Sequence, residues 1–473
     1  MLFNSLEFLV LLTATFFLYY LPLLGAFQIH ILLLSSILFY GWSQPSLTLL
    51  LLLSILINAV SSHRVFYGAE KHRLGWATLG VSVNLGILLF FKYTGMIYRT
   101  LYTATPATGS IGDFLLHLPL PVGISFFTFQ GISLVVDTYR TRNARSQDFQ
   151  LSPRFSRHLL TISFFKAFFP QLVSGPIVKA KEFLPQIGKK ELAGIDWNRC
   201  IKSLILGFFL KSVIADQLKD QTYWITPSYF QNCSSLTLLA LLIGYSMQIF
   251  ADFAGYSLIA IGTARLFGYE LPRNFHWPYL SRSFSEFWNR WHISLSSWLK
   301  QYLYIPLGGN RHGSGRTYLN LIIVMFLGGL WHGAAWSYAV WGLWHGVLLA
   351  GERLLGGNAP KGPYSNLEAL IRTILVFSLV SLGWLLFRLP NFGEAVLYVK
   401  CLITNLHREN QSMLIFATCL FSLPVVGLHL TALWKERRGR NLPDWVENFG
   451  YAVMLFFIVS NSGAPGEFIY FQF

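Results

Sequence analysis

Two histidines lie in stretches that combine aromatic residues with glycines and carry few charges. His332 follows Gly-Gly-Leu-Trp and precedes a glycine, inside the apolar run 321–346. His292 lies at the centre of the run 284–302, which holds several tryptophans. An imidazole titrates near neutral pH, and placing one in an apolar segment is costly enough to indicate a function. The alternative is a core histidine hydrogen-bonded to a backbone carbonyl, and for His332 the chemistry favours the functional interpretation.

Each histidine needs a segment that holds it in place. We expect residues 284–302 to form one amphipathic helix, lying in the membrane interface or in a protein-lined cavity, with His292 at the border of its two faces. Its apolar stripe would be Trp288, Trp291, Leu295, Trp298 and Tyr302. Residues 321–346 are long enough for a single spanning helix, in which small residues admit another backbone or a substrate. His345 would then lie about 140° from His332, so we expect it to be structural.

A further polar face is predicted on the apolar run 236–267. Gln248, Asp252 and Tyr256 recur there at every fourth position, which places them on one side of a helix. A carboxylate in such a segment is expected to face protein rather than lipid. Asp252 could orient a histidine, pair with an arginine or cap a neighbouring helix, and these structural roles are favoured over direct catalysis.

The composition is that of a membrane protein. Of the 473 residues 53% are hydrophobic and only 12% are charged. The net charge of +15 comes from basic residues in short loops between apolar runs, which favours positive-inside topology and contact with anionic lipid. No pattern typical of nucleic-acid binding occurs. The four cysteines, at 200, 233, 401 and 419, lack the spacing of a disulfide framework or a metal site.

We expect an all-α polytopic membrane protein with about 10–12 transmembrane or re-entrant helices. The apolar runs are 6–24, 28–42, 47–61, 74–91, 115–136, 159–178, 201–214, 236–267, 321–346, 369–386, 413–433 and 451–460. Prolines and a glycine interrupt the fifth run, so its helix should begin near Gly123. Basic loops at 64–73, 140–145 and 435–440 are predicted to be cytoplasmic, with the N-terminus outside. Without internal repeats, the whole chain 1–473 is expected to form one membrane domain.

Several motifs, in order along the chain, resemble the membrane-bound O-acyltransferase family. They are closest to its bacterial branch, which acts in alginate O-acetylation and in D-alanyl transfer to teichoic acids. The motifs are Pro-Val-Gly-Ile-Ser-Phe-Phe-Thr-Phe-Gln at 121–130, Phe-Pro-Gln-Leu-Val-Ser-Gly-Pro-Ile at 169–177, Gln-Ile-Phe-Ala-Asp-Phe-Ala-Gly-Tyr-Ser at 248–257, Phe-Trp-Asn-Arg-Trp-His at 287–292, Tyr-Ile-Pro-Leu-Gly-Gly-Asn-Arg at 304–311 and Gly-Gly-Leu-Trp-His-Gly-Ala-Ala-Trp at 328–336. The motif core therefore covers about 121–346.

The resemblance implies two catalytic histidines, His332 as the near-invariant one and His292 as the second. It also implies helices around a central tunnel, with acetyl-CoA as donor from the cytoplasm and an acceptor hydroxyl from the other side of a bacterial inner membrane. An extracytoplasmic SGNH-type protein, or another polysaccharide-acetylation protein, is the implied partner. No metal and no permanently bound cofactor are expected. Candidates for donor binding are Trp291, Trp331, Arg290, Gln248 and Asp252.

The residue chemistry suits O-acyl transfer. This reaction needs a base that takes the hydroxyl proton and a hydrogen-bond donor that stabilises the oxyanion. No Ser or Cys stands in a nucleophile-elbow pattern, so direct transfer is favoured over an acyl-enzyme. An alginate-like exopolysaccharide is the preferred acceptor, while peptidoglycan, cellulose and teichoic acid stay open. Two other classes also stay open: a transporter of a polysaccharide precursor or lipid with histidine proton relays, and a scaffold that recruits a polysaccharide synthase.

Overall fold

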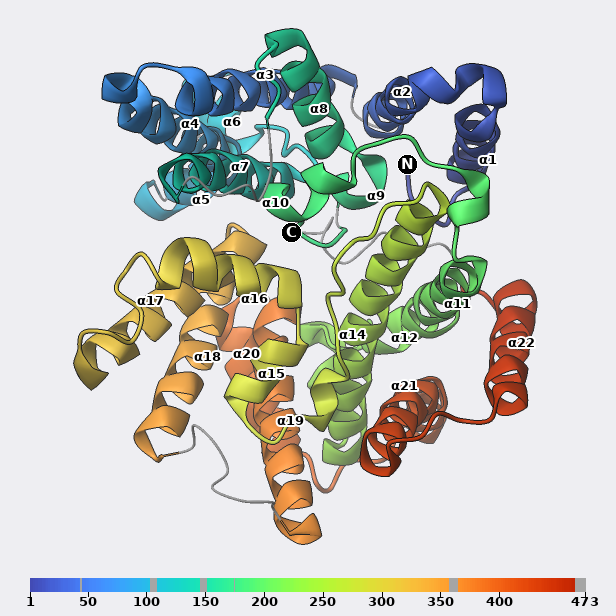
Figure 1. Cartoon of the computed structure of the whole chain (residues 1–473). Coiled ribbons are helices and arrows are strands. Elements are labelled where there is room, and N and C mark those ends of the chain that lie inside the picture. Colours follow the sequence, from blue (N-terminus) through green and yellow to red (C-terminus); the bar gives the residue numbers. More distant parts are fainter. Residues whose placement is uncertain (43–44, 103–108, 145–150, 174, 357–364, 464–473) are drawn as a thin grey trace. The chain divides into compact units, whose positions relative to one another are not determined.

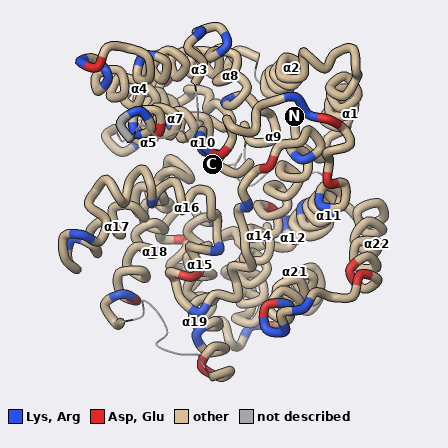
Figure 2. Tube along the Cα trace, viewed as in Figure 1, with Lys and Arg blue, Asp and Glu red and all other residues tan. Residues whose placement is uncertain are grey.

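A computed structural model describes residues 1–42, 45–102, 109–144, 151–173, 175–356 and 365–463 (Figure 1). Regular structure in these residues consists of helices, which confirms the all-α expectation. Most of the helical length carries neither acidic nor basic residues (Figure 2). Within the described ranges, six helices are long and apolar enough to cross a membrane: Pro22–Gly41, Pro45–Tyr67, Glu70–Leu101, Ser235–Leu266, Asn366–Arg388 and Ser412–Arg438.

The chain divides into two compact units, of which the first comprises Met1–Ser203 and Ile259–Pro272. Its main helices are α1 (Leu6–Tyr20), α2 (Gln28–Gly41), α3 (Pro45–Tyr67), α4 (Arg73–Leu88), α7 (Ile124–Ala144) and α8 (Phe155–Ala167). Helix α3 packs against α4, α7 and α8. Their interface includes a reciprocal amide pair between Asn58 and Asn84, at 2.9 and 3.1 Å. Helix α7 begins directly after Gly123, which has a φ of 75°, as the interrupting prolines and glycine predict.

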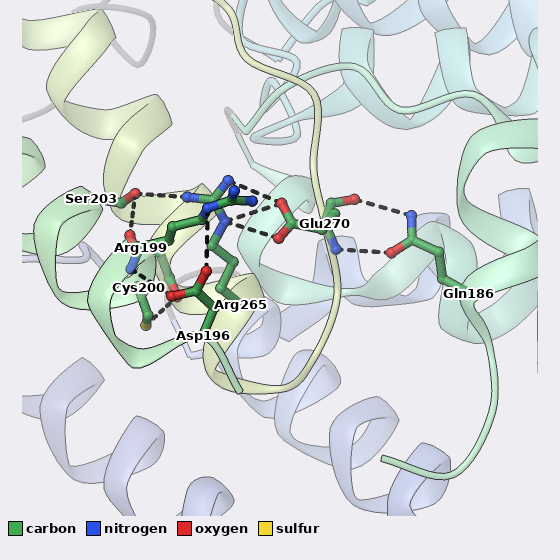
Figure 3. A network of polar contacts seen from close by, with 8 residues as sticks. Gln186, Asp196, Arg199, Cys200, Ser203, Arg265 and Glu270 are labelled. Atoms are coloured by element: carbon green, nitrogen blue, oxygen red, sulfur yellow. Dashed lines mark hydrogen bonds and ion pairs between the residues drawn. The ribbon is translucent and has the colours of Figure 1, made fainter. Parts of the chain in front are cut away.

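A polar network connects residues of this first unit that lie far apart in the sequence (Figure 3). The Arg265 guanidinium pairs with Glu270 at 3.0 Å and donates to the Ser203 hydroxyl at 2.9 Å. The Gln186 amide bonds both to the backbone N–H and to the carbonyl of Glu270, at 2.8 and 3.1 Å. The Gln186 side chain satisfies both backbone hydrogen-bonding groups of Glu270, as a neighbouring strand would in a sheet. It therefore holds the loop after α14 (Ser235–Leu266) in place.

The second unit comprises Leu204–Leu258 and Arg273–Phe473 and holds both histidine motifs. Its helices include part of α11 (Trp197–Phe208), the π-helical turn η6 (Phe209–Ala215), α12 (Asp216–Thr222), most of α14, α15 (Phe284–Arg290), α16 (Ile293–Leu299), α17 (Gly313–His332), α18 (Trp336–Leu354), α19 (Asn366–Arg388), α20 (Phe392–Thr404), α21 (Ser412–Arg438) and α22 (Asp444–Ser460). Helix α18 packs extensively against α17 and also against α19.

Two single helices expected from the sequence are each broken. Residues 284–302 form α15 and α16 with a turn at Trp291 and His292, so the prediction of one amphipathic helix is wrong. Residues 321–346 form the end of α17 and the start of α18, joined by a turn at 333–335, so the single spanning helix is also wrong. The turn at Gly333 needs glycine, because a Cβ there would lie 2.2 Å from the Tyr338 ring.

The helices α17 and α18 pack unusually closely. A Cβ at Gly329 would lie 2.2 Å from the Tyr338 carbonyl oxygen, and one at Gly342 would lie 2.2 Å from the Met325 carbonyl oxygen. Real Cβ atoms cannot approach that far, so only glycine permits this backbone contact. The pair therefore forms a tight helical hairpin, and His332 lies at its turn.

Candidate active site

His292 occupies a strained turn between α15 and α16. Its φ of 41° lies in the left-handed region, where non-glycine residues are uncommon, and its side chain is fully buried. Such conformations persist when surrounding contacts over-determine them, and they cluster at functional sites. The start of α15 is itself fixed from α18, because the Glu352 carboxylate accepts hydrogen bonds from the backbone N–H groups of Phe284 and Ser285, at 2.9 and 3.0 Å.

Asn274 holds this turn against α14. Its carbonyl accepts from the N–H of Ile293 at 2.9 Å, and its side-chain oxygen accepts from the Ser294 hydroxyl at 2.6 Å. Its side-chain amide donates to the Ser257 hydroxyl on α14 at 3.0 Å. Asn274 is 1% exposed, so these hydrogen bonds are shielded from water. The asparagine thereby ties the residues that follow His292 to a long helix.

His332 is the last residue of α17 and is buried. Three aromatic rings surround it, those of Trp331, Trp341 and Phe387, with centroids 5.1 to 5.2 Å from the imidazole centroid. The imidazole rings of His332 and His292 lie 6.2 Å apart, and Trp331 also contacts His292 at 5.9 Å. The structure therefore brings the two predicted histidines together, although forty residues separate them in sequence.

His345 belongs to the same aromatic cluster. Its ring lies 4.8 Å from Trp341, which itself contacts His332, and 5.2 Å from Trp288. The estimate of 140° assumed a straight helix and does not apply, because the hairpin turn intervenes. His345 lies one aromatic ring away from His332 and is fully buried.

A cavity of about 750 Å³ lies beside this pair of histidines. Ala334 and Ala335, from the turn that follows His332, line it together with Tyr338 and Phe387. The remaining lining is mostly polar: Lys211, Asp216, Lys219, Asp220, Thr222, Tyr223, Tyr245, Gln248, Asp252 and Arg388, with Ala215 and Pro390. A polar cavity at this position can admit a hydrated, hydroxyl-bearing molecule to the neighbourhood of His332.

Asp252 pairs with a lysine, a partner that the sequence did not indicate. The Lys211 ammonium lies 2.8 Å from the Asp252 carboxylate and 2.7 Å from that of Asp216, and all three side chains are buried. Lys211 lies in the π-helical turn η6, a distortion that often accompanies functional sites. Gln248, one turn before Asp252, accepts a hydrogen bond from the Thr222 hydroxyl. Both of these donor-binding candidates thus line the cavity.

Two further donor-binding candidates, Arg290 and Trp291, lie at the end of α15, directly before His292. Trp291 is 1% exposed and contacts Phe287 at 5.6 Å and Trp384 at 4.8 Å, so it belongs to the core. Arg290 pairs with Glu286 at 2.9 Å and with Glu436 at 3.5 Å. Partial burial, followed by the charges of Arg273 and Arg290, lowers the pKa of the nearby His276 from its ordinary value.

Sequence reasoning missed three residues of this region. Asn274 lies in a loop without periodicity, and Lys211 and Arg388 each lie near the end of an apolar run, where a basic residue normally marks the membrane surface. A signal existed for Lys211, because a lysine five residues before Asp216 breaks an otherwise apolar run. Nothing local indicated Asn274.

Comparison with known proteins shows the family of this chain. The family model described as MBOAT, membrane-bound O-acyltransferase family, matches residues 28–370. The chain belongs to this family. It is 36% identical over 402 residues to the probable alginate O-acetylase AlgI of Pseudomonas aeruginosa, covering 84% of this chain and 73% of that protein. It is also 32% identical to the peptidoglycan O-acetyltransferase of Helicobacter pylori, covering 93% of this chain and 91% of the relative.

A more distant similarity connects this membrane-bound O-acyltransferase to a different acyl group. The teichoic acid D-alanyltransferase of Bacillus subtilis is 29% identical over 280 residues, or 56% of this chain and 68% of that protein. The resemblance inferred from the motifs is therefore confirmed, and the protein is an O-acyltransferase of the membrane. Membership of the family supports the enzyme interpretation over a transporter or a scaffold.

Proposed function

We propose that the protein moves an acetyl group from cytoplasmic acetyl-CoA to a hydroxyl on the far side of the bacterial inner membrane, for the O-acetylation of an alginate-like exopolysaccharide. The observation that carries the proposal is the pair of buried imidazoles, 6.2 Å apart, beside a polar cavity. The names of the relatives supply the acetyl group and the polysaccharide. The whole chain 1–473 would act as one membrane domain, with its motif core at 121–346.

His332 is proposed as the general base. The acceptor hydroxyl transfers its proton to this imidazole while its oxygen attacks the thioester carbonyl, which gives a tetrahedral oxyanion. Collapse of that intermediate expels the coenzyme A thiolate, which takes the proton back from the imidazolium. An ester and a thiol result, and no proton is consumed. Direct transfer of this kind needs no acyl-enzyme.

His292 is proposed to hold or polarise the donor thioester. The left-handed turn and the bonds of Asn274 fix the backbone around it, so this imidazole is preorganised, and its ring faces Phe253 at 4.6 Å and Trp331 at 5.9 Å. A hydrogen-bond donor that is already fixed near the developing oxyanion needs little reorganisation when the transition state forms. Trp331 is well placed to support this role, because it contacts both imidazoles.

The donor is proposed to enter beside Arg290. This arginine lies 3.5 Å from Glu436, so it adjoins the segment 435–440, whose four basic residues bring positive charge near the end of α15. Coenzyme A carries phosphates, which arginine binds well. Basic residues there also agree with a cytoplasmic location, since such loops remain inside. Trp291 is buried in the core and would act by packing.

The acceptor is proposed to reach His332 through the cavity between α12, α14 and α19. An extracytoplasmic SGNH-type or other polysaccharide-acetylation protein is the proposed partner on this side of the membrane. Peptidoglycan is the second candidate, because the relative from Helicobacter pylori is named for it and matches almost the full length of this chain.

The test compares His332→Ala, His292→Ala and His345→Ala in purified protein with labelled acetyl-CoA. His332→Ala should lower turnover by roughly 10²–10⁴-fold while donor affinity survives. His292→Ala should weaken donor binding as well as turnover, and His345→Ala should cost at most some stability. Thermal melting excludes misfolding. A folded His332→Ala protein that transfers acetyl at the wild-type rate removes the base from the mechanism. Absence of acetyl-CoA binding in the wild type would favour transport.

A further inference from the structure

The cavity beside His332 is lined by three basic side chains that differ in how they are paired. Lys211 lies between the carboxylates of Asp216 and Asp252, at 2.7 and 2.8 Å. Its charge is therefore already balanced, and its position is fixed from two helices. Lys219 is exposed, next to Asp220 at the rim. Lys211 therefore offers no unpaired cation to a molecule inside the cavity, and the charge of Lys219 is exposed to solvent, which screens it.

Arg388 is the third basic residue and is paired differently. Within the part of the chain that the structure describes, no carboxylate lies at ion-pair distance from its guanidinium. Its single hydrogen bond there is a long one, 3.5 Å from Nη2 to the carbonyl oxygen of Thr222. Its Nε is buried and finds no acceptor among the same residues. A buried donor without an acceptor is costly, so this arrangement suits a guanidinium that awaits a ligand.

The position of Arg388 relates it directly to the proposed base. It ends α19, and the residue before it, Phe387, packs on the imidazole of His332 at 5.2 Å. Phe387 and Arg388 both line the cavity. A molecule that presents a hydroxyl to His332 would therefore bring its neighbouring groups within reach of Arg388. Neutral hydrogen-bonding groups accompany the arginine, from Thr222, Tyr245 and Gln248.

We propose that Arg388 binds an anionic group of the acceptor, a carboxylate or a phosphate, and so selects acidic glycans over neutral ones. The planar guanidinium matches both anions through two parallel hydrogen bonds, which a hydroxyl does not allow. Lys211 acts only as a fixed structural charge. The inference rests on the proposed function, since it takes the cavity to be the acceptor site.

The experiment measures binding and transfer separately with three probes. These are an oligomannuronate, which carries carboxylates, an oligo(glycerol phosphate), which carries phosphates, and a cellooligosaccharide, which is neutral. The proteins are wild type, Arg388→Gln, Arg388→Lys and, as the matched control on the same helix, Arg372→Gln, which removes an arginine that pairs with Glu368 at 3.0 Å and does not line the cavity. Affinities for each probe and for acetyl-CoA are determined on purified protein in detergent, and transfer is followed with labelled acetyl-CoA. Thermal melting reports folding.

We expect the wild type to bind at least one anionic probe more tightly than the neutral one. Arg388→Gln should weaken that binding by about 10–100-fold, the scale of a lost charge-assisted pair. Arg388→Lys should retain part of it. Acetyl-CoA affinity should stay unchanged, and Arg372→Gln should bind every probe as the wild type does. Loss for the oligomannuronate alone identifies a uronate, and loss for the phosphate oligomer alone identifies a phosphate-bearing polymer.

Two outcomes overturn the proposal. One is a wild-type protein that binds the neutral probe as tightly as both anionic probes. The other is a folded Arg388→Gln protein with unchanged affinity for both anionic probes. If the wild type binds an anionic probe but turns over no acetyl-CoA, the proposed function fails while the binding measurements still decide the role of Arg388.

Discussion

Replacing Asn274 with alanine tests whether the turn at His292 must be held for catalysis. The variant loses the bond to the Ser257 hydroxyl at 3.0 Å and the bond from the Ser294 hydroxyl at 2.6 Å. Both serines are buried, at 2% and 3% exposure, so each hydroxyl loses a partner out of reach of water. At about 1–2 kcal/mol for each, the expected loss of stability is about 2–4 kcal/mol. The backbone bond to Ile293 remains.

The effect on the rate should exceed the effect of instability alone. The left-handed conformation of His292 stores strain of order 1–3 kcal/mol, and the bonds of Asn274 help to hold it. Without these bonds we expect the His292 imidazole to move out of position. A misplacement of about 1 Å can lower the reaction rate by about 10²-fold. We expect transfer from bound acetyl-CoA to slow by about 10–100-fold.

The assay is single-turnover acetyl transfer at saturating acetyl-CoA, with thermal melting of the same preparation. The matched control is Ser5→Ala, which removes the cap of α1, a bond of 3.2 Å from the N–H of Phe8 to the Ser5 hydroxyl, and costs about 1 kcal/mol without touching the site. It should melt earlier yet transfer normally. Asn274→Ala protein that is folded and transfers at the wild-type rate would refute the reasoning, because the turn would then need no clamp.

Two further predictions concern charge and packing. Lys211→Met should destabilise the protein by about 3–5 kcal/mol, because the carboxylates of Asp216 and Asp252 remain buried without their cation. Adding Asp216→Asn and Asp252→Asn should restore much of the melting temperature, and a triple variant that melts no higher than Lys211→Met would contradict this. Gly342→Ala should lower stability by about 1–3 kcal/mol or more, whereas Gly427→Ala, where a Cβ meets open space, should be neutral or stabilising by up to about 1 kcal/mol in the same melting assay. Equal melting of the two alanine variants would mean that the hairpin tolerates separation.

The motifs around His332 show how far local sequence reaches. An imidazole among glycines and tryptophans in an apolar run is chemically unusual in any fold. His332 could therefore be recognised as a functional candidate without knowing which residues surround it in space. The order of the motifs then indicated the family, which the family model confirms. The all-α class followed equally directly, because apolar runs of this length have few other solutions in a bilayer. The roles of His332 and His292 stay predictions.

What the sequence alone determined about this protein is therefore its class, its family and the residues most able to do chemistry. Tertiary structure decided where the chain turns and which distant groups meet. Hydrophobic periodicity indicates which face of a helix is apolar, but it does not show where the helix ends. At His292 and Gly333 the apolar pattern continues across the break, and no proline marks the end of the helix. The ion pair of Lys211 with Asp252, and the bonds from Asn274 to Ser294, join residues on separate elements. Such contacts depend on which helices pack together, and no local pattern carries that information.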